Sequence, residues 1–295
     1  MISYWDRILR ERTSRRRLLA ITGATAAAAF LAACGSNSGD DETTAGQQSE
    51  PNDKPSTTYV LVRAAWLGAW AWDGLTPLLT QEGHRAVAVE LPGHGADKTP
   101  ASEVALDGYV NAVTSALDAH GPSVLVGHSV GGIVISQAAE ARPDKVSALV
   151  YVSGFLLPDG ASFVAATEGV EGSMVLDNLV FTPDGNTVTV RDEAMHEAFA
   201  HDVPADAFDA VRPLIVPEPT APLSTALSLT DANWGRLPRY YVECLQDRAI
   251  PLAVQQAMYQ ALPVRQVFSM QTSHSPNFAA PQELAEHLIA VTREV

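Results

Sequence analysis

The chain has 295 residues, of which 46% are hydrophobic, and a formal net charge of −15 at pH 7. This length can bury one large hydrophobic core or two modest ones. A surface this acidic repels nucleic acid and anionic head groups, so we expect no nucleic-acid partner. The two cysteines are Cys34, within a signal-like segment, and Cys244, within an apolar run, which excludes a disulfide framework.

Residues 1–34 have the pattern of an export signal with a lipobox. Arg15, Arg16 and Arg17 precede 16 uncharged, Ala-rich residues from Leu18 to Ala33, and Cys34 follows directly. A basic region, a short apolar region and a small-residue cleavage site are typical of export, and the paired arginines resemble a twin-arginine signal. The alternative, a transmembrane anchor, is disfavoured because this run is short and weakly apolar. We expect a bacterial protein, exported and anchored to the outer face of the cytoplasmic membrane through a lipid on Cys34.

Residues 35–57 are rich in Ser, Thr, Gly, Asp and Gln and have almost nothing to bury. This composition predicts a disordered linker between the anchor and a domain. Removal of residues 1–33 would leave 13 basic and 32 acidic residues, a net charge of −19. Attachment to a membrane would therefore come from the lipid rather than from a basic surface.

Residues 58–295 are expected to form one α/β domain. Apolar runs of strand length at 59–66, 86–91, 123–127, 146–154, 239–245 and 265–270 alternate with segments of helical periodicity. Strands that are apolar on both faces and separated by helices indicate a mostly parallel, doubly wound sheet with helices on both sides.

The stretch from about 155 to 235 interrupts this alternation. Its sequence FTPDGNTVTV predicts a hairpin with the turn at Pro183–Gly185. An insertion of this size in an α/β sheet is usually a cap over the ligand site.

Three polar residues each follow a predicted strand, in the order Ser129, Asp247 and His274. Reactive residues of a doubly wound sheet lie where strands end. A nucleophilic serine needs a base to take its proton, and the base needs a carboxylate to orient it. Gly127 and Gly131 flank Ser129 in a strand-to-helix context, which favours a nucleophile in a tight turn over a structural serine.

The motifs extend well beyond these three residues. They are WLGAWAWDGLTPLLTQEGHRAVAVELPGHG, VGHSVGG, LQDRAIP and TSHSPNFAAPQELAEHL. With these motifs the chain resembles the methylesterase and hydroxynitrile-lyase branch of the α/β-hydrolase superfamily and its bacterial esterase-like relatives. The resemblance implies Ser129 as nucleophile, His274 as base and Asp247 as acid. It also implies an oxyanion hole made by the backbone N–H groups of Ala65 and Val130.

Two departures from the family pattern bear on function. Arg63 and Ala64 stand where the family usually has His-Gly, which puts a cation beside the site and narrows the backbone freedom of the loop. The effect on activity stays open at this point. Ser275 stands where the hydroxynitrile lyases of this branch have a lysine, which argues for hydrolysis.

Two further residues are candidates for the substrate pocket, Trp66 and His94, because they lie close to the end of the first strand and in the LPGHG loop. A metal site is disfavoured, since His196 and His201 in HEAFAH are one residue too far apart for the zinc pattern.

The sequence thus predicts a serine carboxylesterase that acts on small or medium uncharged esters without metal or cofactor. Two alternatives remain, a ligand-binding protein that has lost turnover and a lyase on the same fold. The sequence does not indicate an oligomeric state.

Overall fold

The computed structural model describes residues 56–294. The predicted export signal, Cys34 and nearly all of the predicted linker lie outside these residues. Within residues 56–294, no helix has both the length and the apolar character needed to cross a membrane.

Six strands form one parallel sheet in the order β2-β1-β3-β4-β8-β9. The strands are β1 (Thr58–Val62), β2 (Arg85–Ala88), β3 (Ser123–His128), β4 (Val146–Val152), β8 (Arg239–Cys244) and β9 (Gln266–Met270). The chain passes from β1 outward to β2 and then returns to place β3 on the other side of β1. The carboxyl ends of β1 and β3 therefore border the switch point, where sheets of this class bind ligands.

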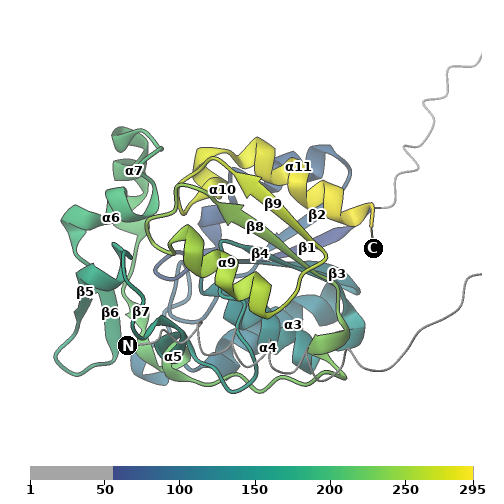
Figure 1. Cartoon of the computed structure of the whole chain (residues 1–295), viewed down its shortest axis with the longest axis horizontal. Coiled ribbons are helices and arrows are strands. Elements are labelled where there is room, and N and C mark those ends of the chain that lie inside the picture. Colours follow the sequence, from purple (N-terminus) through teal and green to yellow (C-terminus); the bar gives the residue numbers. More distant parts are fainter. Residues whose placement is uncertain (1–55, 295) are drawn as a thin grey trace, which may run out of the picture.

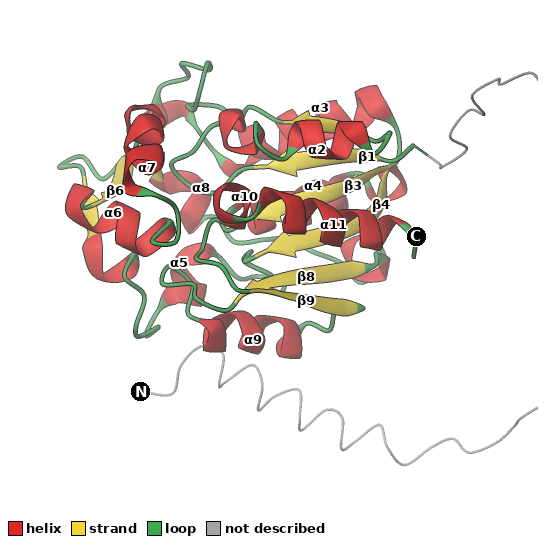
Figure 2. Ribbon diagram, turned by 90° about the horizontal axis from the view of Figure 1, so that it is seen from above, coloured by secondary structure: helices red, strands yellow, loops and turns green. Residues whose placement is uncertain are grey.

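Helices cover both faces of the sheet (Figures 1 and 2). One face carries α3 (Leu106–His120), α4 (Gly131–Ala141) and α9 (Leu252–Ala261), and the other carries α2 (Thr76–Gln81), α10 (Pro276–Ala279) and α11 (Pro281–Thr292). Each face has its own hydrophobic cluster, the first with Ile133 and Met258 and the second with Leu79 and Leu284. The prediction of an α/β fold with a mostly parallel, doubly wound sheet is confirmed.

The first strand ends earlier than the hydrophobic run predicted. It stops at Val62, and Trp66 has a φ of 66°, which lies in the left-handed region and cannot continue a strand. The side chain of Arg63 turns into a buried ion pair instead of following the sheet. The prediction that residues 63–66 extend the strand is wrong, because a run of apolar residues does not reveal where the backbone turns.

Residues 153–238, between β4 and β8, are called the cap segment below. It contains α5 (Phe163–Thr167), α6 (Asp192–Phe199), α7 (Ala205–Val211) and α8 (Thr220–Ser224). The predicted hairpin is confirmed as the antiparallel pair β5 (Leu179–Phe181) and β6 (Thr187–Val190). A third short strand, β7 (Glu218–Pro219), pairs with β6 and was not predicted. Figure 1 shows α6, α7 and this small sheet on the side of the main sheet where its strands end.

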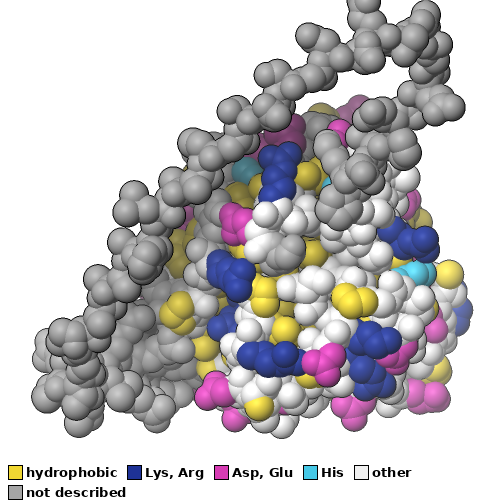
Figure 3. All heavy atoms as spheres, turned by 90° about the vertical axis from the view of Figure 1, so that its right-hand side faces the viewer, with side chains coloured by type: hydrophobic (Ala, Val, Ile, Leu, Met, Phe, Trp, Pro, Cys, Tyr) yellow, Lys and Arg dark blue, Asp and Glu magenta, His cyan; other side chains and the backbone are white. Residues whose placement is uncertain are grey.

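The side of the molecule away from the cap segment presents mixed charge. Figure 3 shows Lys and Arg side chains interspersed with Asp and Glu on this face. The mixture of the two signs weakens the attraction of this face for polyanions.

The turn between β3 and α4 is built around two glycines. A Cβ on Gly127 would lie 2.6 Å from the carbonyl oxygen of Gly131, and a Cβ on Gly131 would lie 2.7 Å from the carbonyl oxygen of Arg63. Both distances are shorter than a real Cβ contact, so larger residues would push the backbone segments apart. Ser129 between them has a φ of 54°.

We predict that Gly127→Ala destabilises the protein by about 1–3 kcal/mol or more, because the new methyl group meets backbone that cannot rotate away. Gly108→Ala in α3 is the matched control, since its Cβ would meet only the Pro92 side chain at 3.6 Å. It should stabilise by roughly 0.5–1 kcal/mol, as expected for Gly to Ala within a helix. Urea denaturation of both variants measures the difference, and equal stabilities would contradict the account of the turn.

Candidate active site

Ser129 lies at the tip of the β3–α4 turn in a conformation that costs energy for a residue other than glycine. Three backbone hydrogen bonds hold it there. Its N–H donates to the Val152 carbonyl at 3.1 Å, and its carbonyl accepts from Gly132 at 3.0 Å and from Phe155 at 2.9 Å. Such a conformation costs about 1–3 kcal/mol, and a residue that its surroundings hold in it is typical of functional turns.

His274 and Asp247 form a direct hydrogen bond. His274 Nδ1 lies 2.7 Å from Asp247 Oδ2, and both side chains are nearly fully buried. An ionised carboxylate can only accept, so Nδ1 carries the proton. The other nitrogen, Nε2, is therefore left with a free lone pair when the ring is neutral.

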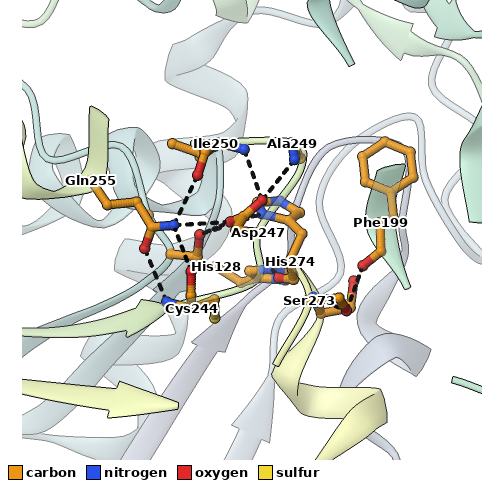
Figure 4. Close-up of polar contacts among 12 residues, drawn as sticks. His128, Phe199, Cys244, Asp247, Ala249, Ile250, Gln255, Ser273 and His274 are labelled. Atoms are coloured by element: carbon orange, nitrogen blue, oxygen red, sulfur yellow. Dashed lines mark hydrogen bonds and ion pairs between the residues drawn. The ribbon is translucent and has the colours of Figure 1, made fainter. Parts of the chain in front are cut away.

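The backbone fixes the orientation of the Asp247 carboxylate. Oδ1 accepts from the N–H groups of Ala249 at 2.7 Å and Ile250 at 2.8 Å (Figure 4). Because both of these donors belong to the main chain, the carboxylate has little freedom to rotate. Oδ2 is thus directed at His274.

Sequence reasoning missed two side chains that complete this arrangement. Ser153, just after β4, donates its hydroxyl to Asp247 Oδ2. Gln255 Nε2 donates to the same oxygen at 3.2 Å and to the Ile250 carbonyl at 2.8 Å. The sequence contains a pattern that could have indicated each of these two residues. Ser153 follows a strand at the same edge as the other site residues, and Gln255 lies three residues before buried Met258 in α9, a polar residue in an apolar stripe.

His128 lies beneath His274 and stays neutral. Its Nε2 lies 2.7 Å from the carbonyl oxygen of His274 and donates to it. Burial first, and then the nearby His274 ring, lower the pKa of His128 to about 3. A ring that is neutral and bonded to the main chain supports the His274 loop rather than acting as a base.

Ser129 and His274 both border two apolar cavities. One is lined by residues that include Phe163, Ile250 and Val254, and the lining of the other includes Trp70 and Phe278. Among residues 56–294, none accepts or donates a hydrogen bond with Ser129 Oγ. Its hydroxyl is therefore available to a ligand, and catalytic hydrogen bonds often form only once substrate is bound.

The two backbone N–H groups expected in the oxyanion hole have no partner within the part of the chain that the structure describes. Ala65 lies three residues after the end of β1, and Val130 precedes α4. Val130 borders one of the two cavities at Ser129, and Ala65 borders the other. Buried backbone N–H groups are almost always paired. Two unpaired ones beside Ser129 are consistent with a site for an oxygen anion.

The two pocket candidates have different positions. Trp66 borders both cavities next to Ser129. His94 is absent from the lining of either cavity and lies buried against Arg63 and Glu218. The prediction that His94 lies at the substrate is wrong, since a buried ion pair that the sequence did not reveal holds its ring away from the cavities.

The cap segment also contacts the loop that carries His274. Asp202 accepts the N–H of Ser273 at 2.7 Å, and the Phe199 carbonyl accepts the Ser273 hydroxyl at 3.1 Å. The Phe199 ring lies 6.0 Å from the His274 ring and borders both cavities. The cap segment thus fixes one wall of the site and one of its loops.

His196 and Cys244, the other residues considered from the sequence, have contacts that fit a structural role. His196 Nε2 bonds to the Val203 carbonyl at 2.8 Å. Across residues 56–294, no cluster of three or more His, Cys, Asp and Glu could hold a metal ion. Cys244 is fully buried, and burial raises the pKa of its thiol well above the usual value.

Comparison with known proteins gives a consistent result. The chain matches the family model described as "Alpha/beta hydrolase family" over residues 59–287. It is 32% identical over 240 residues to a pyrethroid hydrolase of Sphingobium wenxiniae, covering 78% of this chain and 85% of that protein. It is 31% identical over 260 residues to methylesterase 2 of Arabidopsis thaliana, covering 81% and 97%.

Other matches agree on the fold. A putative chloroplastic methylesterase 11 of Arabidopsis thaliana is 30% identical over 82% of this chain, which spans 65% of the length of that relative. A crystal structure of a pyrethroid hydrolase superposes with a TM-score of 0.71 at 29% identity, covering 81% of this chain and 98% of that one. Polyneuridine aldehyde esterase has a TM-score of 0.72 at 23% identity, which supports the fold alone.

Proposed function

The chain belongs to the alpha/beta hydrolase family, and from that premise we propose that it cleaves carboxylic esters through an acyl-enzyme on Ser129. Its relatives are named as methylesterases and as a pyrethroid hydrolase, which places this chain among serine carboxylic-ester hydrolases. The observation that carries the assignment of residues is the His274–Asp247 hydrogen bond beside the strained turn that presents Ser129.

In the proposed mechanism, His274 transfers the proton and Ser129 forms the bond to the substrate. His274 Nε2 takes the proton of the Ser129 hydroxyl while Oγ attacks the ester carbonyl, and Asp247 stabilises the imidazolium through Nδ1. The N–H groups of Ala65 and Val130 bind the oxygen anion that forms. His274 then protonates the leaving alcohol, and water, activated by the same nitrogen, cleaves the acyl-enzyme.

We propose an uncharged substrate with an apolar group on each side of the ester. No Asp, Glu, Lys or Arg lines either cavity at Ser129. A charged group would lose its hydration there without gaining a partner.

We further propose that the enzyme is exported and anchored by a lipid on Cys34. The support is the basic, apolar and small-residue pattern of residues 1–34. A lipid on Cys34, with the predicted linker up to residue 57, would hold the domain near the outer face of the cytoplasmic membrane.

A fluorophosphonate probe should label the wild-type protein at Ser129, because an activated serine attacks the phosphorus atom. Ser129→Ala should lose the label and ester cleavage together, measured by mass spectrometry and with an acyl-chain-length series of nitrophenyl esters. Ser275→Ala is the control, since Ser275 borders one cavity without a role in the steps above. Cleavage that survives in Ser129→Ala would remove the proposal, as would cyanohydrin cleavage with no ester cleavage.

Asp247→Asn should lower kcat by about 10⁴-fold without unfolding the protein. The N–H groups of Ala249 and Ile250 retain the amide oxygen at the Oδ1 position, so the NH₂ group must face His274. That NH₂ donates to Nδ1 and moves the ring proton to Nε2, which can then no longer accept from Ser129. Steady-state kinetics with a melting curve measure this, and a loss below tenfold would contradict the role of Asp247.

Cys34→Ala should abolish lipid attachment and release the domain from membranes. Expression in a bacterial host fed with a clickable fatty acid measures incorporation, and fractionation measures location. Cys244→Ala is the matched control and should keep the label, because Cys244 is buried in the domain. Equal labelling of Cys34→Ala and wild type would contradict the anchor.

A further inference from the structure

A fully buried ion pair connects the loop after β1 to the cap segment. Arg63 Nη1 lies 2.9 Å from Glu218 Oε2, and the two side chains are 1% and 0% exposed. Arg63 follows β1, and Glu218 is the first residue of β7 in the cap segment. The cation at position 63 is thus neutralised by a carboxylate, rather than left free beside the site.

Two more side chains complete this cluster, which we call the Arg63 network (Arg63, His94, Tyr109 and Glu218). Tyr109 accepts from Arg63 at 3.0 Å and donates to Glu218 Oε1 at 2.9 Å. His94 Nδ1 lies 2.7 Å from Arg63 Nη2, and its Nε2 lies 2.9 Å from Glu218 Oε2. Arginine only donates, so Nδ1 accepts from Arg63 and the proton of the neutral ring is carried by Nε2.

The network is costly to bury. Removing two charges from water has a penalty that their attraction often fails to recover, and apolar replacements of similar size are often neutral or stabilising. Burial alone would raise the pKa of Glu218, but Arg63 and His94 lower it to about 2, so the carboxylate is ionised at neutral pH. The ion pair between Arg63 and Glu218 is therefore not explained by a gain in the stability of the folded protein.

The guanidinium also holds the peptide that follows it. Arg63 Nη1 donates to the carbonyl oxygen of Ala64 at 3.0 Å. That carbonyl and the N–H of Ala65 belong to one planar trans peptide, in which the two groups point in opposite directions. Fixing the oxygen therefore fixes the direction of the Ala65 N–H.

The cap segment holds the next residue on three sides. Glu218 Oε2 accepts the N–H of Trp66 at 2.8 Å, Val216 donates to the Trp66 carbonyl at 3.0 Å, and Trp66 Nε1 donates to the Val188 carbonyl at 2.8 Å. These bonds maintain the left-handed φ of 66° at Trp66. The two peptides that flank Ala65 are thus held from opposite ends, the Ala64–Ala65 peptide by Arg63 and the Ala65–Trp66 peptide by Glu218.

We infer that Glu218 and Arg63 are positioning residues that orient the Ala65 N–H as a donor to the oxygen anion. This inference rests on the proposed ester hydrolysis and adds a function for the cap segment, which completes the oxyanion hole besides lining the cavity. It also gives a physical reason for Arg63 and Ala64 in place of His-Gly. The Arg63 guanidinium holds the Ala64 carbonyl in place, so the loop does not need the wider backbone freedom of a glycine at position 64.

The test is a charge-neutral double variant, Arg63→Met with Glu218→Met, which removes both buried charges at once. A misdirected donor weakens binding of the anionic transition state but not of the neutral ester, so kcat should fall on the order of 10- to 100-fold with KM within about threefold. The amide of Trp66 should also exchange with solvent faster, measured by NMR. Arg63→Met with Glu218→Gln keeps an acceptor for the Trp66 N–H and should lie between this variant and wild type.

Glu140→Met is the matched control. Glu140 also accepts backbone N–H groups of the cap segment, from Thr230 at 2.9 Å and Trp234 at 3.1 Å, but it borders neither cavity at Ser129. It should lower the melting temperature and leave kcat unchanged. If the double variant does not fold, Arg63→Lys replaces it, since one ammonium cannot reach all the acceptors of the guanidinium. Arg63→Lys should lower kcat at constant KM.

The outcomes separate the two proposals. If the wild-type protein cleaves no ester, the proposed function is wrong, and the Arg63 network then has no role in catalysis. A wild type that depends on Ser129, together with a folded double variant or Arg63→Lys whose kcat stays within twofold, overturns the positioning role alone. A lower melting temperature without a change in kcat likewise overturns it, because a merely structural pair would behave in that way.

Discussion

The close approach of two backbone segments determines the geometry of the whole site. Val62 pairs with Gly127, so the chain that leaves β1 runs directly beside the turn that follows β3. The contact is so tight that a Cβ on Gly131 would lie 2.7 Å from the carbonyl oxygens of Val62 and of Arg63. The distance between the nucleophile and the loop after β1 is therefore set by sheet register and by a missing side chain, rather than by any catalytic residue.

Two buried polar clusters lie at this edge, and they differ in what they can do. In the first, Asp247 receives backbone and side-chain donors but keeps one oxygen directed at His274, whose outer nitrogen remains open to the cavity. In the second, the charges of Arg63 and Glu218 face each other, Tyr109 and His94. The first cluster can transfer a proton, while the second can only hold geometry.

The sequence predicted those site features that depend on local context. Ser129, Asp247 and His274 each follow a hydrophobic run of strand length, and parallel strands end at one edge, so their meeting could be foreseen. Glu218 could not be, because it belongs to a two-residue strand without a hydrophobic pattern and its partner lies 155 positions away. The interpretation of His94 failed for the same reason, since its position depends on that pair. The end of β1 was misplaced because φ at Trp66 depends on hydrogen bonds from the cap segment.

These contacts constrain how substrate reaches Ser129. Movement of the whole cap segment as a rigid lid would separate Glu218 from Arg63 and leave two buried charges without partners, which costs about 3–5 kcal/mol where one partner is removed. It would also break the bonds that hold Trp66 and Ser273. The cost is lower for the part of the cavity wall formed by α7 and the residues after it, where Phe208, Val211 and Ile215 border the cavity. There Arg212, a partly exposed side chain, forms ion pairs with Asp192 and Asp209. Exposed ion pairs contribute little to stability. The bonds of β6 and β7 to Trp66 and Arg63 thus hold this part of the cap segment to the site, whereas partly exposed ion pairs hold α7.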